Sequence, residues 1–195
     1  MINYLRYFLL LFNVPWRFDA KKSQQTLYGI SVTSLRVMPW DIDLNLHLTN
    51  SRYPAFLDIV RTKQFFELGI ISLFVRGGWT TVLASQTVTF IREIKPFEKI
   101  RIESKLLYWD DKYFYVEHRW LVKNKLHCKA IARVAMIHKG KVQSLGSMLK
   151  ARDKMNRLTE RDYPAPHLKL GLSSVPEVDA KIELLSRLRD SEPSL

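Results

Sequence analysis

Four long runs of strand-forming residues follow one another with only short turns between them, at residues 80–94, 99–109, 113–123 and 126–138. In the second run, apolar side chains alternate with charged ones, as in a strand that buries one face. The turn at residues 109–112 has the length of a hairpin connection, and Asn124 makes the next bend. Strands joined by such short turns pair in antiparallel fashion. The sequence therefore predicts an antiparallel sheet in this half of the chain.

One strand and one helix precede these runs. Residues 26–38 are rich in β-branched side chains and end at Pro39, which predicts a strand. A helix is predicted from about Ser51 to Leu68, with Asn50 or Ser51 capping its first amides. Its apolar residues spread around more than one face, so the helix needs to be wrapped. The order predicts an α+β fold, with the sheet curled around one central helix.

A chain of 195 residues with 47% hydrophobic side chains fits a single folded domain. We divide it into an N-terminal apolar segment (1–22), the domain itself (23–146) and a basic C-terminal extension (147–195) with a short helix over residues 179–189. The single cysteine, Cys128, excludes an intrachain disulfide framework. It fits a reducing compartment, and we expect a cytoplasmic location.

The first 22 residues contain an apolar run from Tyr7 to Phe12, flanked by Arg6 and Asn13. A membrane-spanning helix needs roughly 20 apolar residues, and no small-residue cleavage site of a signal peptide follows. We expect this segment to pack on the domain or on a partner subunit. The alternative is a peripheral membrane contact with Trp16 and Arg17 at the interface.

The chain carries 31 Lys and Arg against 19 Asp and Glu, a net charge of +12. Much of the excess lies in residues 123–161, and such a charge attracts polyanions. Nucleic acid would require exposed aromatic side chains, whereas Phe114, His118 and Trp120 alternate as a buried face does. We therefore expect no nucleic acid partner, and favour a phosphate-bearing ligand or an anionic membrane.

The chemistry is concentrated in residues 39–53, where Asp41, Asp43, His47 and Asn50 precede the helix start. A helix N-terminus presents unpaired amides that stabilise an oxyanion, and a nearby carboxylate acts as a base or a nucleophile. This combination suits hydrolysis of an activated acyl group. The alternative is that these residues only form turns and caps. Nothing later in the chain completes a metal site, so we expect no metal and no cofactor.

The same residues resemble a known family. Asp41-x-Asp43, His47 and Asn50, with Arg52-Tyr53 and Phe56, Asp58 and Arg61 further along, are similar to the motif of hotdog-fold acyl-CoA thioesterases of the 4-hydroxybenzoyl-CoA thioesterase type. Residues 92–100 resemble that family's link between its second and third strands. The string at residues 39–53 is closest to the branch named after thioesterase superfamily member 6. The resemblance covers residues 27–138.

This resemblance implies a helix wrapped by five or six antiparallel strands, and a homodimer or homotetramer with sites at the interface. It implies hydrolysis of acyl-CoA to the free acid and coenzyme A. Asp43 would be the catalytic base or nucleophile, and His47 and Asn50 would orient the loop or cap the helix. Asp41 would have a structural role.

Three departures from the family pattern favour an alternative function. Leu46 stands where many members have Gly, and its Cβ restricts positive φ. Thr49 stands where Asn is common, and Pro54 follows Tyr53. The alternative is a non-catalytic protein that binds acyl thioesters or acts as a membrane-associated scaffold.

Five residues are candidates for substrate binding. Tyr53 belongs to the motif, and Gln86 lies in the middle of a strand that faces substrate in the family. Arg133, Lys139 and Lys141 lie on or after the last strand, where they would meet the phosphates of coenzyme A. The alternative for each of these cations is a solvated strand face.

Overall fold

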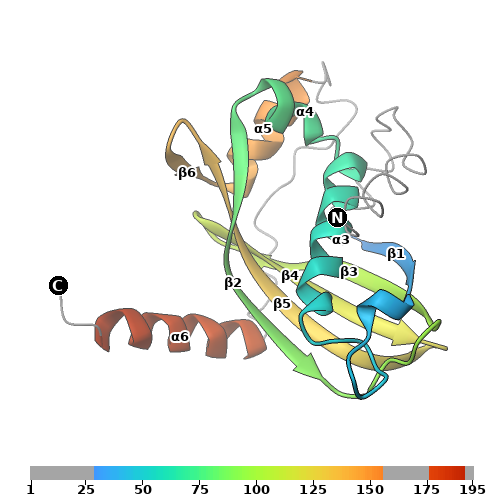
Figure 1. Ribbon diagram of the computed structural model, residues 1–195. Helices are drawn as coiled ribbons and strands as arrows, with labels where there is room; N and C mark the ends of the chain where they lie inside the picture. The colour runs from blue at the N-terminus through green and yellow to red at the C-terminus, as the bar shows by residue number, and fades with distance from the viewer. Residues whose placement is uncertain (1–28, 156–175, 192–195) are drawn as a thin grey trace.

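The computed structural model describes residues 29–155 and 176–191, and one antiparallel sheet organises them (Figure 1). Its central order is β1-β3-β4-β5-β2, and β6 pairs with β5. The strands are β1 (Ile30–Arg36), β2 (Trp79–Phe90), β3 (Lys99–Trp109), β4 (Tyr113–Val122), β5 (Lys125–His138) and β6 (Lys141–Gln143). The short turns between β3, β4 and β5 give the antiparallel pairing that the sequence predicts.

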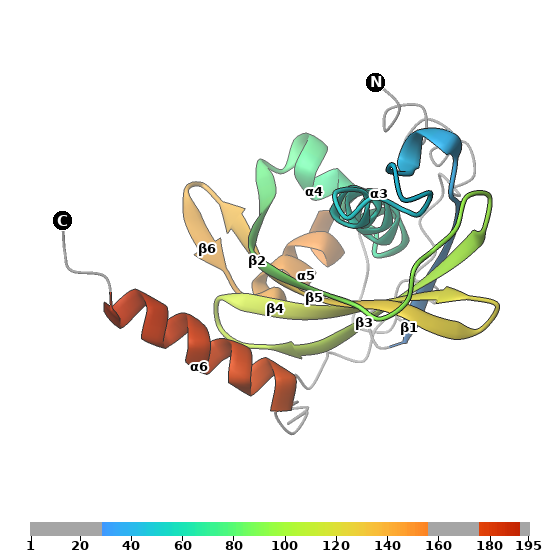
Figure 2. The same ribbon diagram turned by 60° about the horizontal axis from the view of Figure 1, so that its bottom comes forward.

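The long helix α3 (Arg52–Glu67) lies in the concave face of this sheet (Figure 2). Its buried side chains Tyr53, Phe56, Leu57 and Val60 form a core with residues from the strands and from the loop before the helix. The prediction of a helix wrapped by a sheet is therefore confirmed. Cys128 belongs to this core, and burial raises the pKa of its thiol to about 12. The thiol is therefore protonated at neutral pH and is no nucleophile.

A second core closes one end of the sheet. Two helices that the sequence analysis did not predict, α4 (Ile71–Arg76) and α5 (Leu145–Met155), pack there with Trp79 and Met136. The division placed after Gly146 falls inside α5. On the outer face of the sheet, Val178 of α6 (Pro176–Ser191) packs against Tyr115 and Ile131. The expected C-terminal helix is thus present and longer than residues 179–189.

Two strands end earlier than predicted. β1 ends at Arg36 because Pro39 begins a short 3-10 turn, η1 (Pro39–Asp41). β2 ends at Phe90 because the amides of Ile91 and Arg92 both donate to the carbonyl of His127, at 2.9 and 3.0 Å. Two donors on one acceptor interrupt the ladder. The chain then turns back towards the loop in front of α3.

The expectations for the N-terminal segment concern residues outside the described ones. Over residues 29–155 and 176–191, the helices are too short or too polar to cross a membrane. Packing and peripheral membrane contact of residues 1–22 both stay predictions.

Candidate active site

The loop before α3 is closed by backbone hydrogen bonds. Ile42 and Leu48 form an isolated antiparallel bridge. Inside it, the amide of Asp43 donates to the carbonyl of His47 at 3.0 Å, and the amide of Leu46 donates to the carbonyl of Asp43 at 3.1 Å. The amide of Leu48 donates to the carbonyl of Ile94 at 2.8 Å, which fixes the loop to the segment after β2. Asp43 and His47 therefore face each other across a tight bend.

Leu46 adopts the left-handed conformation, with φ of 60°. This conformation raises the free energy of a non-glycine residue by roughly 1–2 kcal/mol, because its Cβ approaches the following carbonyl oxygen. The Cβ of Leu46 restricts positive φ, as expected from the sequence. The loop nevertheless keeps the conformation that glycine favours, and the Leu46 side chain points into solvent with 67% of its surface exposed.

Both oxygens of the Asp43 carboxylate have partners in the loop. Oδ1 accepts a hydrogen bond from the amide of Asn45 at 2.9 Å. Oδ2 lies 3.3 Å from Nδ1 of His47, and about a third of each side chain is exposed. The carboxylate is thus held in one orientation and is still open to solvent. This is the geometry required of a general base or a nucleophile.

Asp41 differs from Asp43 in that it is fully buried. Its Oδ2 accepts from the amide of Met38 at 2.9 Å, and its carbonyl accepts from the amide of Thr49 at 2.9 Å. Nε of Arg52 lies 3.5 Å from its Oδ1. Asp41 thereby ties η1, the loop and the first residue of α3 together, which is the structural role expected for it.

The N-terminus of α3 faces this loop without the predicted cap from Ser51. The Ser51 backbone is already helical, with φ −67° and ψ −19°, and within the described residues its side chain makes no capping hydrogen bond. A capping side chain needs an extended backbone at that position, so the prediction for Ser51 is wrong. The first turn of α3 therefore keeps its partial positive charge.

A surface hollow lies beside the loop, lined by His47, Leu48, Asn50, Tyr53 and residues 90–93. Tyr53 packs edge-on against Phe90, with ring centroids 4.9 Å apart. Burial raises the pKa of Tyr53, so its hydroxyl stays protonated at neutral pH. The structure thus brings Asp43, His47, Asn50 and Tyr53 to one place.

The other candidates lie elsewhere in the described chain. Oε1 of Gln86 accepts from Nη1 of Arg61 at 3.3 Å, beneath α3. The Arg133 guanidinium stacks on Tyr113, 3.6 Å from the ring centroid. Lys139 and Lys141 stand at the β5–β6 turn, while the loop lies near the first residues of β5. Within one chain, these four residues are not part of the hollow.

Sequence reasoning missed a buried polar contact beneath α3. Oγ of Ser104 and Nδ1 of His118 lie 2.7 Å apart, and both side chains are fully buried. The two residues are direct cross-strand partners in β3 and β4. Strand alternation placed each on the inner face, but only the register of pairing reveals the contact.

The sequence of residues 37–160 matches the family described as the thioesterase-like superfamily. The chain belongs to this superfamily. It is 36% identical over 85 residues to protein THEM6 of Xenopus laevis, covering 44% of this chain and 41% of that protein. It is 32% identical over 109 residues to the probable thioesterase YBR096W of Saccharomyces cerevisiae, covering 54% of this chain and 47% of that protein. The chain thus spans about half the length of these relatives.

Solved structures show the same fold. A probable thioesterase from Bartonella henselae matches with a TM-score of 0.55 at 20% identity, covering 60% of this chain and 99% of that one. The BH1999 gentisyl-coenzyme A thioesterase matches with a TM-score of 0.56 at 18% identity, covering 62% of this chain and 99% of that one. At these identities the likeness concerns the fold alone, which is the hotdog fold that the sequence motif implied.

Proposed function

We propose that this protein hydrolyses acyl-CoA thioesters to the free acid and coenzyme A. The observation that carries the proposal is the Asp43 carboxylate, which is oriented by Asn45 and His47 yet open to solvent. It stands in the loop that leads into the uncapped N-terminus of α3. A general base or nucleophile next to an oxyanion-stabilising helix end is the arrangement that acyl transfer needs.

In the reaction, the thioester carbonyl oxygen, where negative charge develops, lies against the first turn of α3. The Arg52 amide already donates to the Thr49 carbonyl at 2.9 Å and Pro54 has no N–H, so the Tyr53 amide and the helix dipole stabilise this oxygen. As a base, Asp43 removes a proton from a water molecule while the water oxygen attacks the carbonyl carbon. The carbon–sulfur bond then breaks, and the leaving thiolate takes the proton from Asp43 to give coenzyme A. As a nucleophile, Asp43 displaces the thiolate to give an acyl anhydride, which water hydrolyses. Both routes use the same carboxylate.

A coenzyme A thioester also accounts for the charge of the chain. Its phosphates are attracted by a protein with a net charge of +12. Two fold neighbours are described as a gentisyl-coenzyme A thioesterase and as a Staphylococcus aureus protein in complex with CoA. We extend this ligand class to the present chain as part of the proposal.

We further propose a homodimer, alone or as half of a homotetramer, formed through the free edge of β2. In the described chain, β2 pairs only with β5, and Val82, Leu83 and Phe90 are exposed along it. A long apolar edge is a template for pairing with a second chain. Two copies related by a two-fold axis pair in antiparallel fashion there. The Trp79 end of one β2 then lies near the Phe90 end of the other.

This dimer would bring two of the candidate substrate-binding cations, Lys139 and Lys141, close to the hollow of the other copy. Lys139 and Lys141 follow the residue of β5 that pairs with Trp79. Antiparallel pairing of two β2 edges therefore carries Lys139 and Lys141 of a second copy towards the hollow beside Asn50 and Tyr53. There the two lysines would bind the phosphates of a thioester. The hollow of a single chain contains neither lysine.

The experiment is a measurement of free-thiol release from a panel of short, long and aromatic acyl-CoAs by the purified full chain. Release from at least one thioester supports the proposal, and the panel defines the acyl class. Binding of acyl-CoA without thiol release from any of them contradicts it.

That second outcome corresponds to the alternative function, a non-catalytic protein that binds acyl thioesters or a membrane-associated scaffold. The observation that favours it is Leu46, which holds the strained bend of the loop with a side chain in place of glycine. A cytoplasmic location belongs to both proposals, since the single thiol of Cys128 is buried and free.

A further inference from the structure

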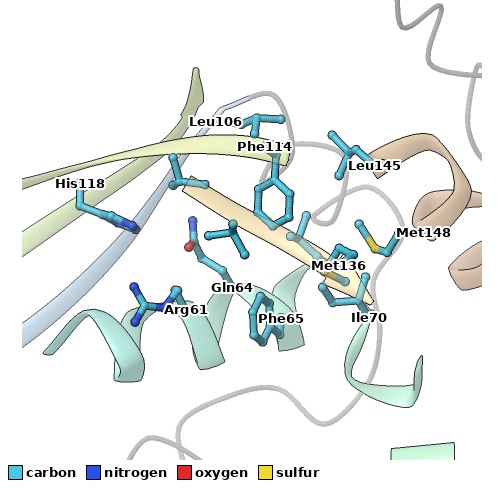
Figure 3. A pocket seen from close by; sticks show the side chains of 13 residues that line it. Arg61, Gln64, Phe65, Ile70, Leu106, Phe114, His118, Met136, Leu145 and Met148 are labelled. Atoms are coloured by element: carbon cyan, nitrogen blue, oxygen red, sulfur yellow. The ribbon is translucent and has the colours of Figure 1, made fainter. Parts of the chain in front are cut away.

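A cavity lies between the second half of α3 and the sheet, away from the Asp43 loop (Figure 3). Arg61, Gln64 and His118 stand at one end, and Leu145 and Met148 stand at the other. Apart from the three polar side chains, the lining is apolar. The cavity measures about 50 Å³, which is room for about four water-sized groups.

His118 has a ring nitrogen that is available to a ligand in this cavity. It is completely buried, and Nδ1 contacts Oγ of Ser104, whereas Nε2 has no hydrogen-bond partner among the described residues. Burial, helped by the nearby Arg61, lowers the pKa of His118 to about 3, so the imidazole is neutral at pH 7. A neutral ring has one N–H. In the tautomer in which the Ser104 hydroxyl donates to Nδ1, the proton resides on Nε2 and is available to a ligand in the cavity.

Arg61 adds a mostly buried cation to the same end. Its Nη1 donates to Oε1 of Gln86 at 3.3 Å, and its Nη2 contacts Asp58. The Arg61 side chain is only 15% exposed, whereas Asp58 is 58% exposed, so water screens the acid more than the guanidinium. The polar end therefore presents donors and positive charge to whatever occupies the cavity.

We propose that this cavity binds a short apolar carboxylate, with its oxygens at Arg61, Gln64 and His118 and its hydrocarbon against the apolar lining. A carboxylate accepts several hydrogen bonds, and those from a guanidinium are the stronger, charge-assisted kind. The methylene groups are removed from water by the apolar lining. A hydrocarbon leaves the polar end without a partner, and an ammonium is repelled by Arg61.

Such a carboxylate has two sources. It is either a free carboxylic acid or the far end of an acyl group that itself carries a carboxylate. The first source requires nothing of the thioesterase activity. The second rests on the proposed function, because the acyl group then belongs to the thioester substrate.

The first arm of the test detects free acids by ligand-observed NMR on the full-length Asp43→Asn protein. Acetate, propionate and butyrate are compared with the alcohols of the same length. The expected dissociation constants are roughly millimolar, as ligands of so few atoms allow, with acids bound at least fivefold more tightly than alcohols.

The variants make this arm specific. Arg61→Met removes the cation, and we expect it to abolish the preference for acids over alcohols. Gln64→Met changes a half-buried helix position and should weaken acid binding. It tests the same proposal if Arg61→Met folds poorly. Arg76→Met removes an exposed arginine from α4 and should leave acid binding unchanged.

The second arm compares hydrolysis of glutaryl-CoA and pentanoyl-CoA by the otherwise unchanged chain. If the carboxylate is the end of an acyl group, Arg61→Met lowers the ratio of kcat/KM for glutaryl-CoA to kcat/KM for pentanoyl-CoA at least tenfold. Acid binding without this selectivity assigns the cavity to free acids. If neither arm responds to a carboxylate, the proposal is overturned and the cavity holds water. Failure to hydrolyse any thioester rejects the proposed function but leaves the first arm intact.

Discussion

Oδ2 of Asp43 lies 3.3 Å from Nδ1 of His47, across the bend that Leu46 completes. Since Oδ1 is already held by the amide of Asn45, this second contact fixes the rotation of the carboxylate. The two side chains thus form a unit in which His47 positions Asp43 for its role in the proposed reaction.

Replacement of His47 tests this positioning role. The amide nitrogen of Asn occupies nearly the same place as Nδ1, so His47→Asn should keep a donor to Asp43, while His47→Leu should not. We expect His47→Leu to lower kcat about 10- to 100-fold, less than the roughly 10²–10⁴-fold that the base itself contributes. His47→Asn should restore most of it, and KM should change little in both variants. Equal losses in the two would contradict the role.

Leu46→Gly tests the strain in the loop. Glycine adopts φ of 60° without a Cβ clash, and the Leu46 side chain is exposed, so little buried area is lost. We expect the free energy of unfolding to rise by about 1 kcal/mol or less, because glycine also gives the unfolded chain more freedom. Leu46→Ala keeps the strain and should show no gain. Urea denaturation curves of the three proteins provide the comparison.

The sequence predicted the sheet and the central helix because their signals are local. Strand alternation, short turns and a helix apolar on several faces need no knowledge of distant residues. α4 and α5 were missed for the opposite reason. α4 has only six residues, too few to show a helical period, and α5 gains its stability from packing on α4 and on the first residues of β2.

The same distinction applies to the site. The motif brought Asp43, His47 and Asn50 together because they share one loop. The Ser104–His118 contact depends on the register of β3 with β4, and the separation of Lys139 from Asp43 depends on the length of β5. Neither register nor the path of a long strand through space follows from composition or spacing.

His118 predicts a specific dependence of stability on pH. Its pKa in the folded protein is lowered to about 3 from an ordinary 6.5, so the unfolded state binds a proton first as the pH falls. The stability from the neutral ring is complete above pH 6.5 and is lost on acidification towards pH 3. Between pH 7 and pH 5 the loss is about 2 kcal/mol. Urea denaturation at several pH values should show this slope, and His118→Gln should reduce it. An unchanged slope in the variant would count against this origin.

The free edge of β2 predicts the effect of one added charge on assembly. Leu83 is exposed along this edge, and a lysine there disfavours pairing with a second strand. We expect Leu83→Lys to shift the mass in solution from a multiple of 23.0 kDa to the monomer value. Val75→Lys adds the same charge at an exposed position of α4. It should leave the mass in solution unaltered. Light scattering after size exclusion distinguishes these outcomes, and a monomeric unmodified chain would reject the interface.

The central claim is that the Asp43 carboxylate carries out thioester hydrolysis. The most direct test is the rate of thiol release by the unmodified chain and by Asp43→Asn, with the best acyl-CoA of the panel as substrate. We expect a loss of at least about 100-fold in kcat, since general base catalysis contributes about 10²–10⁴-fold. Unfolding curves should overlap, because Asp43 is partly exposed and asparagine keeps an acceptor for the Asn45 amide. Unchanged turnover in the folded variant would show that Asp43 is not the catalytic carboxylate.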